Sequence, residues 1–396
     1  MPIRYVDRAP RSADLVVVGG GVVGAATAFH AARAGIRVVL VEARPRLATL
    51  TTAVAAGAYR LQFEDHEELE LVRRSVELFR NFEDATGQRE YDLRLRERGY
   101  LWLTSEPDNA ARQRASVERL RTWGQRDVEI VDGDAVRERW PWVSPDVLQA
   151  RWRAADGFLD TRRLTHGLVA GAGCDVLTGA ALTAFTVTGD RVTAAVTDRG
   201  SIACGAVAVC AGPLSGPLAG LAGVELPVAT VVRHKLVLPD VPEVDPGGPM
   251  TIDEDTGAHW RPAHRSGAWL LFTDPATPPS APTMDVPTDH RFAFRLLDPA
   301  SAVSVARTVP FWRRVWERGS DPWMLQAGQY TVAPDHRPVI GATGVEGLFV
   351  NTAYAGHGIM QGPAGGEVCA RAILDPGGSN PLDLSTERRR REQPVL

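Results

Sequence analysis

A glycine-rich turn near the start of the chain, between a buried strand and an alanine-rich helix, constrains the fold more than any other feature. Residues Asp14–Val18 (DLVVV) form a short β-branched apolar run without alternation, which is typical of a strand buried on both faces of a parallel sheet. The turn Gly19–Gly24 follows at once, and Ala25–Ala34 predicts a helix with Gly35 as its C-terminal cap. A second apolar run, Ile36–Val41, completes a predicted strand–turn–helix–strand unit.

The turn contains the pattern G-x-G-x-x-G, in which each glycine has a separate mechanical role. Gly19 permits the tight turn, Gly21 lets a diphosphate approach the backbone, and Gly24 lets the helix pack closely on the strand. The helix start offers free N–H groups and a partial positive charge to that diphosphate. Glu42, at the end of the second strand, can accept hydrogen bonds from ribose hydroxyls and disfavours a 2′-phosphate, so NADP is a poor candidate. The unit therefore predicts a dinucleotide site and leaves FAD and NAD both open.

Composition narrows the function further. A net charge of −4 gives no basic field of the kind that holds nucleic acid. The four cysteines are scattered without C-x-x-C spacing, so we expect neither a disulfide framework nor a metal site, and a reducing, cytoplasmic setting. The sequence has no run of about 18 apolar residues and no apolar signal-peptide core, so neither a membrane span nor export is expected.

The rest of the chain predicts a mixture of helices and strands. An amphipathic helix is expected over about 66–86 and a second helix over 109–123, and the proline-rich segment Asp274–Pro287 is expected to be an irregular loop. Short apolar runs predict strands at 100–104, 181–187, 191–197, 206–210, 228–238, 269–273 and 347–351. A chain of 396 residues with elements in this order is long enough for an α/β domain into which a more antiparallel domain is inserted.

Three further segments give the chain a resemblance to a known family. They are Thr51–Phe63 (TTAVAAGAYRLQF), Val209–Pro227 (VCAGPLSGPLAGLAGVELP) and Gln329–Gly366, which contains Pro-Asp-x-x-Pro and Gly-His-Gly. With the opening unit, they resemble the D-amino-acid-oxidase-type FAD oxidoreductases, in the branch that contains glycine oxidase, sarcosine oxidase and dimethylglycine dehydrogenase. The resemblance runs from Leu15 to about Asp375, and it is greatest to proteins similar to the β subunit of heterotetrameric sarcosine oxidase.

The resemblance implies an α/β fold, namely a Rossmann-type FAD-binding domain with an inserted, antiparallel-sheet-rich substrate domain. On this pattern, residues 1–85, 151–226 and 326–396 form the FAD-binding domain, the last part including a C-terminal tail. Residues 86–150 and 227–325 form the substrate domain. FAD would lie extended, with its isoalloxazine ring between the two domains.

The resemblance also implies which residues hold FAD. Gly356, His357, Gly358 and Ile359 would lie beside the pyrimidine end of the flavin, at the start of the last long helix, and Met360 is also implied as a cofactor-binding residue. A helix N-terminus there can stabilise the negative charge that builds up at N1–C2=O on reduction. The other residues implied for the cofactor are Gly19, Gly21, Val22, Val23, Gly24, Glu42, Ala43, Arg44, Thr51, Thr52, Ala211 and Gly212.

The chain departs from the monomeric sarcosine oxidases at three places. Met360 stands where those proteins have a lysine that holds the substrate carboxylate. Gly328 stands where they have the cysteine that links the flavin, so we expect noncovalent FAD. Their oxygen-activating lysine falls in a strand that resembles Trp269–Thr273, which contains no lysine, so oxygen and another electron acceptor both stay open.

The activity implied by the resemblance is oxidation of an amine or amino acid, secondary or N-substituted, to an imine by hydride transfer to flavin N5. Such a step needs a neutral amine, a C–H bond aimed at N5 and an anchor for the rest of the substrate. Two alternatives keep the flavin: oxidation of a 2-hydroxy acid, and a flavin-carrying subunit that passes electrons to a partner in a homo- or hetero-oligomer. A third alternative is an NAD-dependent dehydrogenase.

Two arginines are candidate substrate anchors. Arg60 matches the flavin-facing arginine of the family's small-residue loop, and a guanidinium suits bidentate capture of a carboxylate. The alternative for Arg60 is a structural ion pair with Glu64 or Asp65. Arg261 resembles a residue of the site-facing strand in the second domain.

Two histidines and a tyrosine complete the candidate catalytic residues. His259 and His357 can handle protons because imidazole titrates near neutral pH, although His357 can instead serve as a flavin contact. The ring of Tyr354 can line the pocket. The only lysine of the chain, Lys235, is expected to be structural or exposed.

Overall fold

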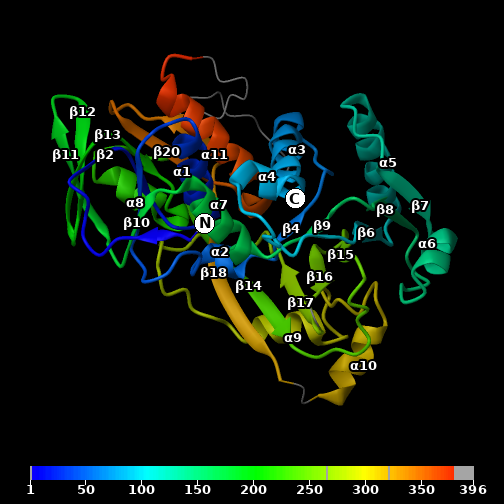
Figure 1. Cartoon of the computed structure of the whole chain (residues 1–396). Helices are drawn as coiled ribbons and strands as arrows, with labels where there is room; N and C mark the ends of the chain where they lie inside the picture. Colours follow the sequence, from blue (N-terminus) through cyan, green and yellow to red (C-terminus); the bar gives the residue numbers. More distant parts are fainter. Residues whose placement is uncertain (1, 265, 320–321, 379–396) are drawn as a thin grey trace.

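The computed structural model describes residues 2–264, 266–319 and 322–378, and this part of the chain forms two large sheets (Figure 1). In the first, a nine-stranded sheet, the order is β1-β10-β3-β2-β13-β12-β11, and β20 pairs with both β13 and β19. Its strands are β1 (Arg4–Tyr5), β2 (Ser12–Val18), β3 (Val38–Glu42), β10 (Asp175–Thr178), β11 (Leu182–Thr188), β12 (Arg191–Thr197), β13 (Gly200–Val209), β19 (Val339–Ala342) and β20 (Leu348–Thr352). The neighbours β1, β10, β3, β2, β13 and β20 pair in parallel, whereas β11, β12 and β19 pair antiparallel.

The central strands of this sheet are apolar on both sides because both faces are covered. Leu15 and Val17 of β2 point into a helical core. Val16 and Val18 point to the opposite face, into a core formed with neighbouring strands and the segment around Ala219. The helical core is formed by α1 (Val22–Arg33), α3 (His66–Arg80), α7 (Thr161–Ala172) and α11 (Gly358–Leu374).

The second sheet has eight strands in the order β18-β14-β17-β16-β15-β6-β8-β7. Apart from the parallel pair β15 and β6, its neighbours run antiparallel. Its strands are β6 (Tyr100–Thr104), β7 (Glu129–Asp132), β8 (Gln149–Arg153), β14 (Ala229–Leu238), β15 (Met250–Asp253), β16 (Ala258–Pro262), β17 (Ala268–Phe272) and β18 (Met324–Val332). The helices α5 (Pro107–Thr122), α6 (Gly133–Arg139), α9 (Arg291–Leu297) and α10 (Phe311–Arg318) flank it (Figure 1).

The two faces of this second sheet differ in character. Leu236, Trp260 and Leu270 are buried in an apolar core with α9 and α10. On the other face, Lys235 and His259 both lie opposite Leu271, and Arg261 lies opposite Trp269. Directly opposed residues of neighbouring strands share a face, so these charged and polar side chains all point to the side that turns toward the nine-stranded sheet.

Short elements connect the two sheets. The strands β4 (Ala58–Tyr59), β9 (Gly157–Phe158) and β5 (Arg96–Glu97) form a small third sheet, and α2 (Thr51–Val54) packs on β18. The expected domain boundaries at 150 and 325 fall inside β8 and β18, which are both strands of the eight-stranded sheet.

Most predicted elements are found with small shifts. The strand–turn–helix–strand unit is confirmed as β2, α1 and β3. The helix expected over 66–86 is interrupted at Asn81, which divides it into α3 and α4 (Phe82–Thr86). Within the fully described segment 274–287 there is neither a helix nor a strand. The helices α2, α6, α7, α9 and α10, and the short helix α8 (Ser215–Gly220), were not predicted.

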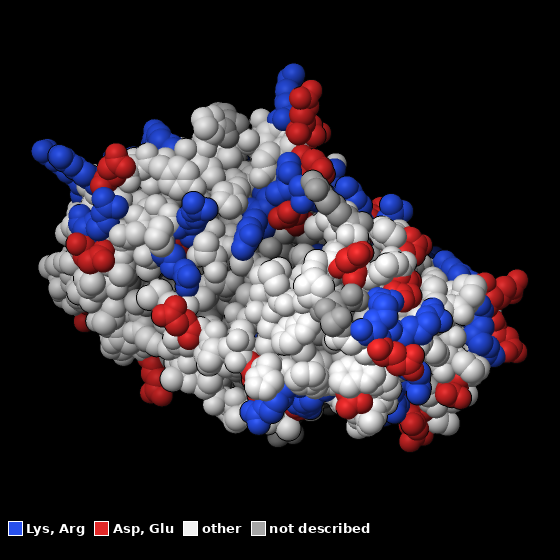
Figure 2. Space-filling model, turned by 90° about the horizontal axis from the view of Figure 1, so that it is seen from below, with Lys and Arg blue, Asp and Glu red and all other residues white. Residues whose placement is uncertain are grey.

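The surface and the helices add two observations. Figure 2 shows one face of the molecule, on which arginine and acidic side chains are interspersed around a largely uncharged central zone. Among the described residues, no helix is both long and apolar enough to cross a membrane.

Candidate active site

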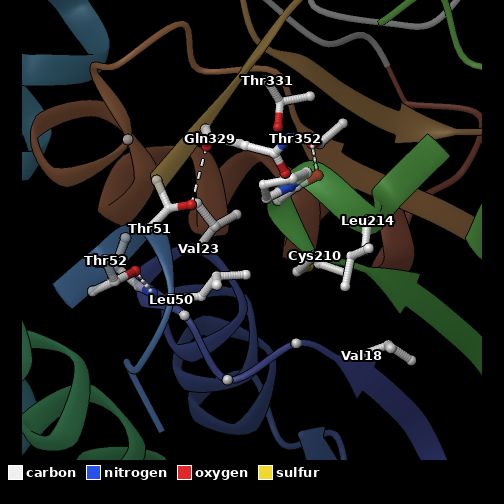
Figure 3. A pocket seen from close by; sticks show the side chains of 18 of the residues that line it. Val18, Val23, Leu50, Thr51, Thr52, Cys210, Leu214, Gln329, Thr331 and Thr352 are labelled. Carbon is white, nitrogen blue, oxygen red and sulfur yellow. Dashed lines mark hydrogen bonds between the residues drawn. The ribbon is translucent and has the colours of Figure 1, made fainter. Parts of the chain in front are cut away.

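A cavity of about 320 Å³ opens where the strands of the nine-stranded sheet end, close to the second sheet (Figure 3). Its wall comes mainly from stretches of chain that lie far apart in sequence: 18–23, 41–44, 48–52, 180–182, 210–214, 329–331, 351–356 and 358–359. Ligands of open parallel sheets bind outside the carboxyl ends of the strands, where this cavity lies. In Figure 3, the Thr51 hydroxyl donates to the carbonyl of Gln329, at 3.0 Å, which joins α2 to β18 at the cavity wall.

The glycine turn is fitted to its surroundings so closely that side chains are excluded. Gly19 has φ +116°, and a Cβ there would lie 2.5 Å from the Cys210 carbonyl oxygen. A Cβ on Gly24 would lie 1.9 Å from the Gly19 carbonyl oxygen. Gly24 does not line the cavity, which agrees with its predicted role in packing α1 on β2. Gly21 does line it, and a Cβ there would lie 3.2 Å from Thr52 Oγ1, so the absence of a side chain lets a ligand approach the backbone.

Two helices begin at this one cavity. Gly21 is the N-cap of α1 and His357 is the N-cap of α11; neither helix start has a side-chain cap or an acid in its first turn. The Val22 N–H donates to Thr52 Oγ1 at 3.2 Å. Helix N-termini carry a partial positive charge and attract anions. The cavity therefore suits a long ligand with negative charge near both helix starts, which is what the extended dinucleotide FAD requires.

Glu42 lies at the edge of the cavity, at the end of β3. Its Oε2 accepts a hydrogen bond from the Gly20 N–H at 2.6 Å, and its Oε1 accepts one from the Arg44 N–H at 2.7 Å. Burial raises the pKa of this carboxyl above its ordinary value, although both N–H groups oppose the shift. The carboxylate is held in a fixed orientation at the place where the sequence predicts a ribose.

Most residues predicted to hold the cofactor are brought together. Those that line the cavity are Gly19, Gly21, Val22, Val23, Glu42, Ala43, Arg44, Thr51, Thr52, Ala211, Gly212, Gly356, Gly358 and Ile359. Three others do not line it. Gly24 packs against Gly19, Met360 is buried in the helical core, and His357 turns toward α3. Met360 therefore does not stand in for the lysine of the monomeric sarcosine oxidases as a group that faces the pocket.

Several lining residues were missed. Leu50 and the Ala180–Leu182 stretch form part of the wall, and Met284 reaches it from the irregular loop. Gln329 and Tyr330 also line it, at the end of β18. Gln329 and Tyr330 begin the Gln329–Gly366 segment, whose resemblance to the family could have indicated them. Nothing in the local sequence around Met284 indicated a site.

Arg60 lies next to the start of α11. Its Nη2 is 3.2 Å from His357 Nε2, and its Nη1 donates to the Gln62 carbonyl. The buried guanidinium lies over the rings of Phe63 and Trp102, with its Cζ 4.2 and 5.3 Å from the two centroids. This position, between α11 and the inner face of the second sheet, suits a substrate anchor.

The acids proposed as alternative partners of Arg60 have other contacts. Glu64 pairs with Arg119 and accepts from the Ser116 hydroxyl at 2.6 Å. Asp65 is the N-cap of α3, where its carboxylate accepts from the Glu67 and Glu68 N–H groups.

Glu68, which sequence reasoning missed, faces His357 from α3. Its Oε1 lies 3.6 Å from His357 Nδ1 and accepts from Gln361 Nε2 at 2.9 Å. Burial alone would raise the pKa of the Glu68 carboxyl, but His357, Gln361 and Arg60 together hold it below its ordinary value. The sequence did contain an indication of Glu68. It precedes Val72 by four residues, so this acid lies on the otherwise apolar, buried face of the predicted helix, where a charged side chain is unusual.

His259 lies on the inner face of the second sheet. Its Nδ1 is 2.8 Å from the Gly257 carbonyl oxygen. A carbonyl only accepts, so Nδ1 carries the proton and Nε2 keeps a lone pair. Burial, aided by the charge of Arg60, lowers the pKa of His259 to about 4 although the Gly257 hydrogen bond opposes the shift. His259 is thus a neutral imidazole at physiological pH.

Arg261 and Tyr354 are more enclosed than expected. The fully buried Arg261 guanidinium lies 3.8 Å from the Trp269 centroid, and its Nε donates to the Ala56 carbonyl at 2.7 Å. Burial lowers its pKa to about 9. Its position indicates that it holds the segment after α2. Tyr354 lines the cavity, but its hydroxyl donates to Asn351 Oδ1 at 2.5 Å in the protein interior.

Lys235 is buried beside these groups. Its Nζ donates to the Ala53 carbonyl at 3.3 Å and lies 4.1 Å from the ring centroid of Trp269. Trp269 belongs to the segment Trp269–Thr273, which itself contains no lysine. Burial, followed by the charges of Arg261 and Arg162, lowers its pKa to about 7. Lys235 thus binds the backbone of α2 at Ala53, and Arg261 binds the same segment three residues further on, at Ala56. Lys235 is therefore buried and structural, and not exposed.

We expect Lys235→Met to stabilise the protein. The pKa near 7 in the folded chain, against 10.5 for an ordinary lysine, means that protonation opposes folding. This cost is complete below about pH 7 and is relieved as the pH rises toward 10. At pH 7 the free energy of unfolding should rise by about 2–4 kcal/mol, and its increase between pH 7 and 10 should become smaller.

Urea unfolding of Lys235→Met at several pH values measures this effect, with the exposed Arg112→Met as a matched control. Because Lys235 is the only lysine, ¹³C-lysine labelling gives one side-chain resonance whose titration reports its pKa. A variant that is less stable than the parent at every pH would contradict the expectation.

Comparison with known proteins identifies the family to which the chain is similar. A family described as FAD dependent oxidoreductase matches residues 14–372. FAD-dependent oxidoreductase domain-containing protein 1 of Xenopus laevis is 28% identical, over 98% of this chain and 85% of that protein. Sarcosine oxidase subunit beta of Arthrobacter sp is 25% identical, over 92% of this chain and 88% of that protein.

Other matches concern longer proteins or the fold alone. The chain spans 44% of the mouse mitochondrial dimethylglycine dehydrogenase, to which it is 25% identical over 97% of its own length. The crystal structure of L-proline dehydrogenase from P.horikoshii superposes with a TM-score of 0.81 at 21% identity, covering 95% of this chain and 97% of that chain. This likeness confirms the predicted fold, a nucleotide-binding α/β domain joined to a sheet-rich second domain.

Proposed function

Because the chain belongs to the family of FAD dependent oxidoreductases, and FAD is accordingly its cofactor, we propose that it oxidises an amine or amino acid to an imine. The observation that carries the proposal is the pairing of a buried guanidinium, Arg60, with His357 at the start of α11, beside the cavity wall. The named relatives give further support: sarcosine oxidase subunit beta, dimethylglycine dehydrogenase and proline dehydrogenase bear names of secondary or tertiary amino acids. An NAD-dependent dehydrogenase is no longer an alternative.

The residues of the cavity would hold FAD along its length. The N–H groups at Gly21 and the start of α1 would bind the diphosphate, and Glu42 would bind the adenosine ribose. Gly356, Gly358 and Ile359 would lie along the pyrimidine end of the flavin. Gly328 has no side chain, so the flavin is held without a covalent bond at that position. When bound, FAD supplies a two-electron oxidant that accepts a hydride at N5.

The substrate would lie between this cavity and the inner face of the second sheet. Arg60 would bind its carboxylate, and the neutral His259 would contact it from β16. A second positive charge near the Arg60 guanidinium is unfavourable, so the site favours the neutral form of the amine. That form carries the lone pair from which the imine develops. Water then hydrolyses the imine to a carbonyl compound and an amine.

Anaerobic reduction of the bound flavin, followed by admission of air, tests the proposal. We expect bleaching of the flavin absorbance with N-methylated or cyclic amino acids, such as sarcosine, dimethylglycine and proline. Bleaching by 2-hydroxy acids alone would overturn amine oxidation in favour of the hydroxy-acid alternative. The oxygen phase addresses the acceptor: fast reoxidation with peroxide release supports an oxidase.

A role as the flavin-carrying subunit of a larger assembly is the second candidate. It is favoured by the match to sarcosine oxidase subunit beta, of which the chain covers 88%. In the same experiment, slow reoxidation in air after normal substrate reduction supports this role, because the electrons then need a protein or soluble acceptor.

A further inference from the structure

Three polar residues next to the cavity form an ordered chain of contacts. Glu68 comes from α3, His357 from the start of α11, and Arg60 from the segment after β4. Successive contacts are 3.6 Å, from Glu68 Oε1 to His357 Nδ1, and 3.2 Å, from His357 Nε2 to Arg60 Nη2. The neighbours of His357, Gly356 and Gly358, line the cavity, so the imidazole lies at its border.

The contacts define the protonation state of the imidazole. A guanidinium has only donors, so Nε2 of His357 must be the acceptor of the Arg60 hydrogen bond. The ring proton is then on Nδ1, which points toward the Glu68 carboxylate. While Arg60 holds the Nε2 lone pair, His357 is not available as a base. Any ligand that draws Arg60 away releases that lone pair.

Glu68 is placed to support a charge on His357. It is buried, and Gln361, one helical turn beyond His357 on α11, donates to it at 2.9 Å. Among the described residues, the charged groups that contact this imidazole are Glu68 from α3 and Arg60 from the segment after β4. The ring of Phe63 packs on it edge-to-face, with 5.3 Å between the ring centroids. An imidazolium at this position would therefore keep one carboxylate partner after Arg60 has turned to a substrate.

We propose that Glu68, His357 and Arg60 form a proton acceptor that the substrate itself releases, with Glu68 as its positioning residue. This inference rests on the proposed amine oxidation. A substrate carboxylate binds Arg60 and leaves His357 Nε2 free. The proton of the substrate ammonium passes to Nε2, giving a neutral amine and an imidazolium whose Nδ1–H faces Glu68. Binding of the acid group and deprotonation of the amine are thereby linked in one step.

Glu68→Gln tests the proposal because it keeps the shape and removes the charge. We expect normal FAD content and a fall in the rate of flavin reduction of about 10- to 100-fold with a secondary amino acid. The acidic limb of the pH profile should also move, because the carboxylate that faces the imidazole of His357 is lost. Glu70→Gln on the same helix, which removes an acid paired with Arg73, is the matched control and should change neither.

A second substrate separates proton transfer from a structural role. N-(2,2,2-trifluoroethyl)glycine has an electron-poor amine that is already neutral at assay pH, so it needs no proton acceptor. The defect of Glu68→Gln should largely disappear with this compound, measured against the parent enzyme. An equal defect with both substrates, or an unchanged pH profile, would overturn the proposal while leaving amine oxidation intact.

A spectroscopic measurement keeps the two proposals distinguishable. Long-range ¹H–¹⁵N spectra of histidine side chains should find His357 in its neutral Nδ1–H form in the parent enzyme without substrate, assigned by His357→Asn. A proton on Nε2 at neutral pH would overturn the chain of contacts, whatever the substrate is. If no amine reduces the flavin but the Nδ1–H form is observed, the proposed amine oxidation is wrong. The contacts between Glu68, His357 and Arg60 are then confirmed, but their role as a proton acceptor for an amine is not.

Discussion

Gly24→Val is expected to weaken the binding of FAD strongly. A Cβ at this position would lie 1.9 Å from the Gly19 carbonyl oxygen and 3.3 Å from the Cys210 Cβ, and valine adds two further carbons. The start of α1 must then move away from β2, and with it the N–H groups that face the cavity. Overpacking of a dense interior costs about 1–3 kcal/mol, and about 1.4 kcal/mol is a tenfold change in affinity. We therefore expect the Kd for FAD to rise about 10- to 100-fold.

Quenching of flavin fluorescence on titration of the apoprotein measures this change. Gly344→Val is the matched control, because Gly344 is exposed and a Cβ there meets no atom within 4 Å. The control should purify yellow and bind FAD like the parent protein. A Gly24→Val protein that purifies with a full complement of FAD would show that α1 tolerates the displacement.

Arg60→Ala is expected to have the largest effect on catalysis. The buried guanidinium is the proposed partner of the substrate carboxylate, and truncating one member of a buried charge pair costs about 2–5 kcal/mol. At about 1.4 kcal/mol per tenfold change in rate, kcat/KM should fall about 10²- to 10³-fold. Arg60→Lys should recover only part of the loss, because an ammonium keeps the charge but not the planar fork.

Stopped-flow reduction of the flavin under anaerobic conditions separates binding from the chemical step. Arg119→Ala removes a half-exposed arginine that pairs with Glu64, and this control should leave the reduction rate unchanged. The anchor role of Arg60 has to be abandoned if Arg60→Ala keeps the parent's affinity for an acidic substrate.

The sequence predicted the parts of the site that are built locally. β2, the glycine turn, α1 and Glu42 lie within one short stretch, so their spacing was enough to predict the turn, its helix start and its acid. The Gly-His-Gly motif also indicated correctly that the last long helix begins there, as α11 begins at Gly358. In both cases the local backbone conformation is set by residues that are neighbours in sequence.

Contacts between distant elements could not be predicted in the same way. Lys235 reaches Trp269 only because β14 pairs with β17, and Glu68 reaches His357 only because α3 packs on α11. Met360 is adjacent to Ile359, yet only Ile359 lines the cavity, since successive residues of a helix face different directions. Such outcomes depend on strand order and helix rotation, which a one-dimensional pattern does not contain.

The scattered origin of the cavity wall, from Val18 to Ile359, has a consequence for biosynthesis. The parallel strand β13 lies between β2 and β20, so the nine-stranded sheet stays incomplete on the ribosome until β20 has been made. A nascent chain that has completed the N-terminal unit still lacks the stretch 351–359, and has no closed compartment for a coenzyme. Flavin loading must then wait until the stretch 351–359 has been made and folded, and the apoprotein has to persist, with its apolar wall uncovered, until a coenzyme molecule arrives.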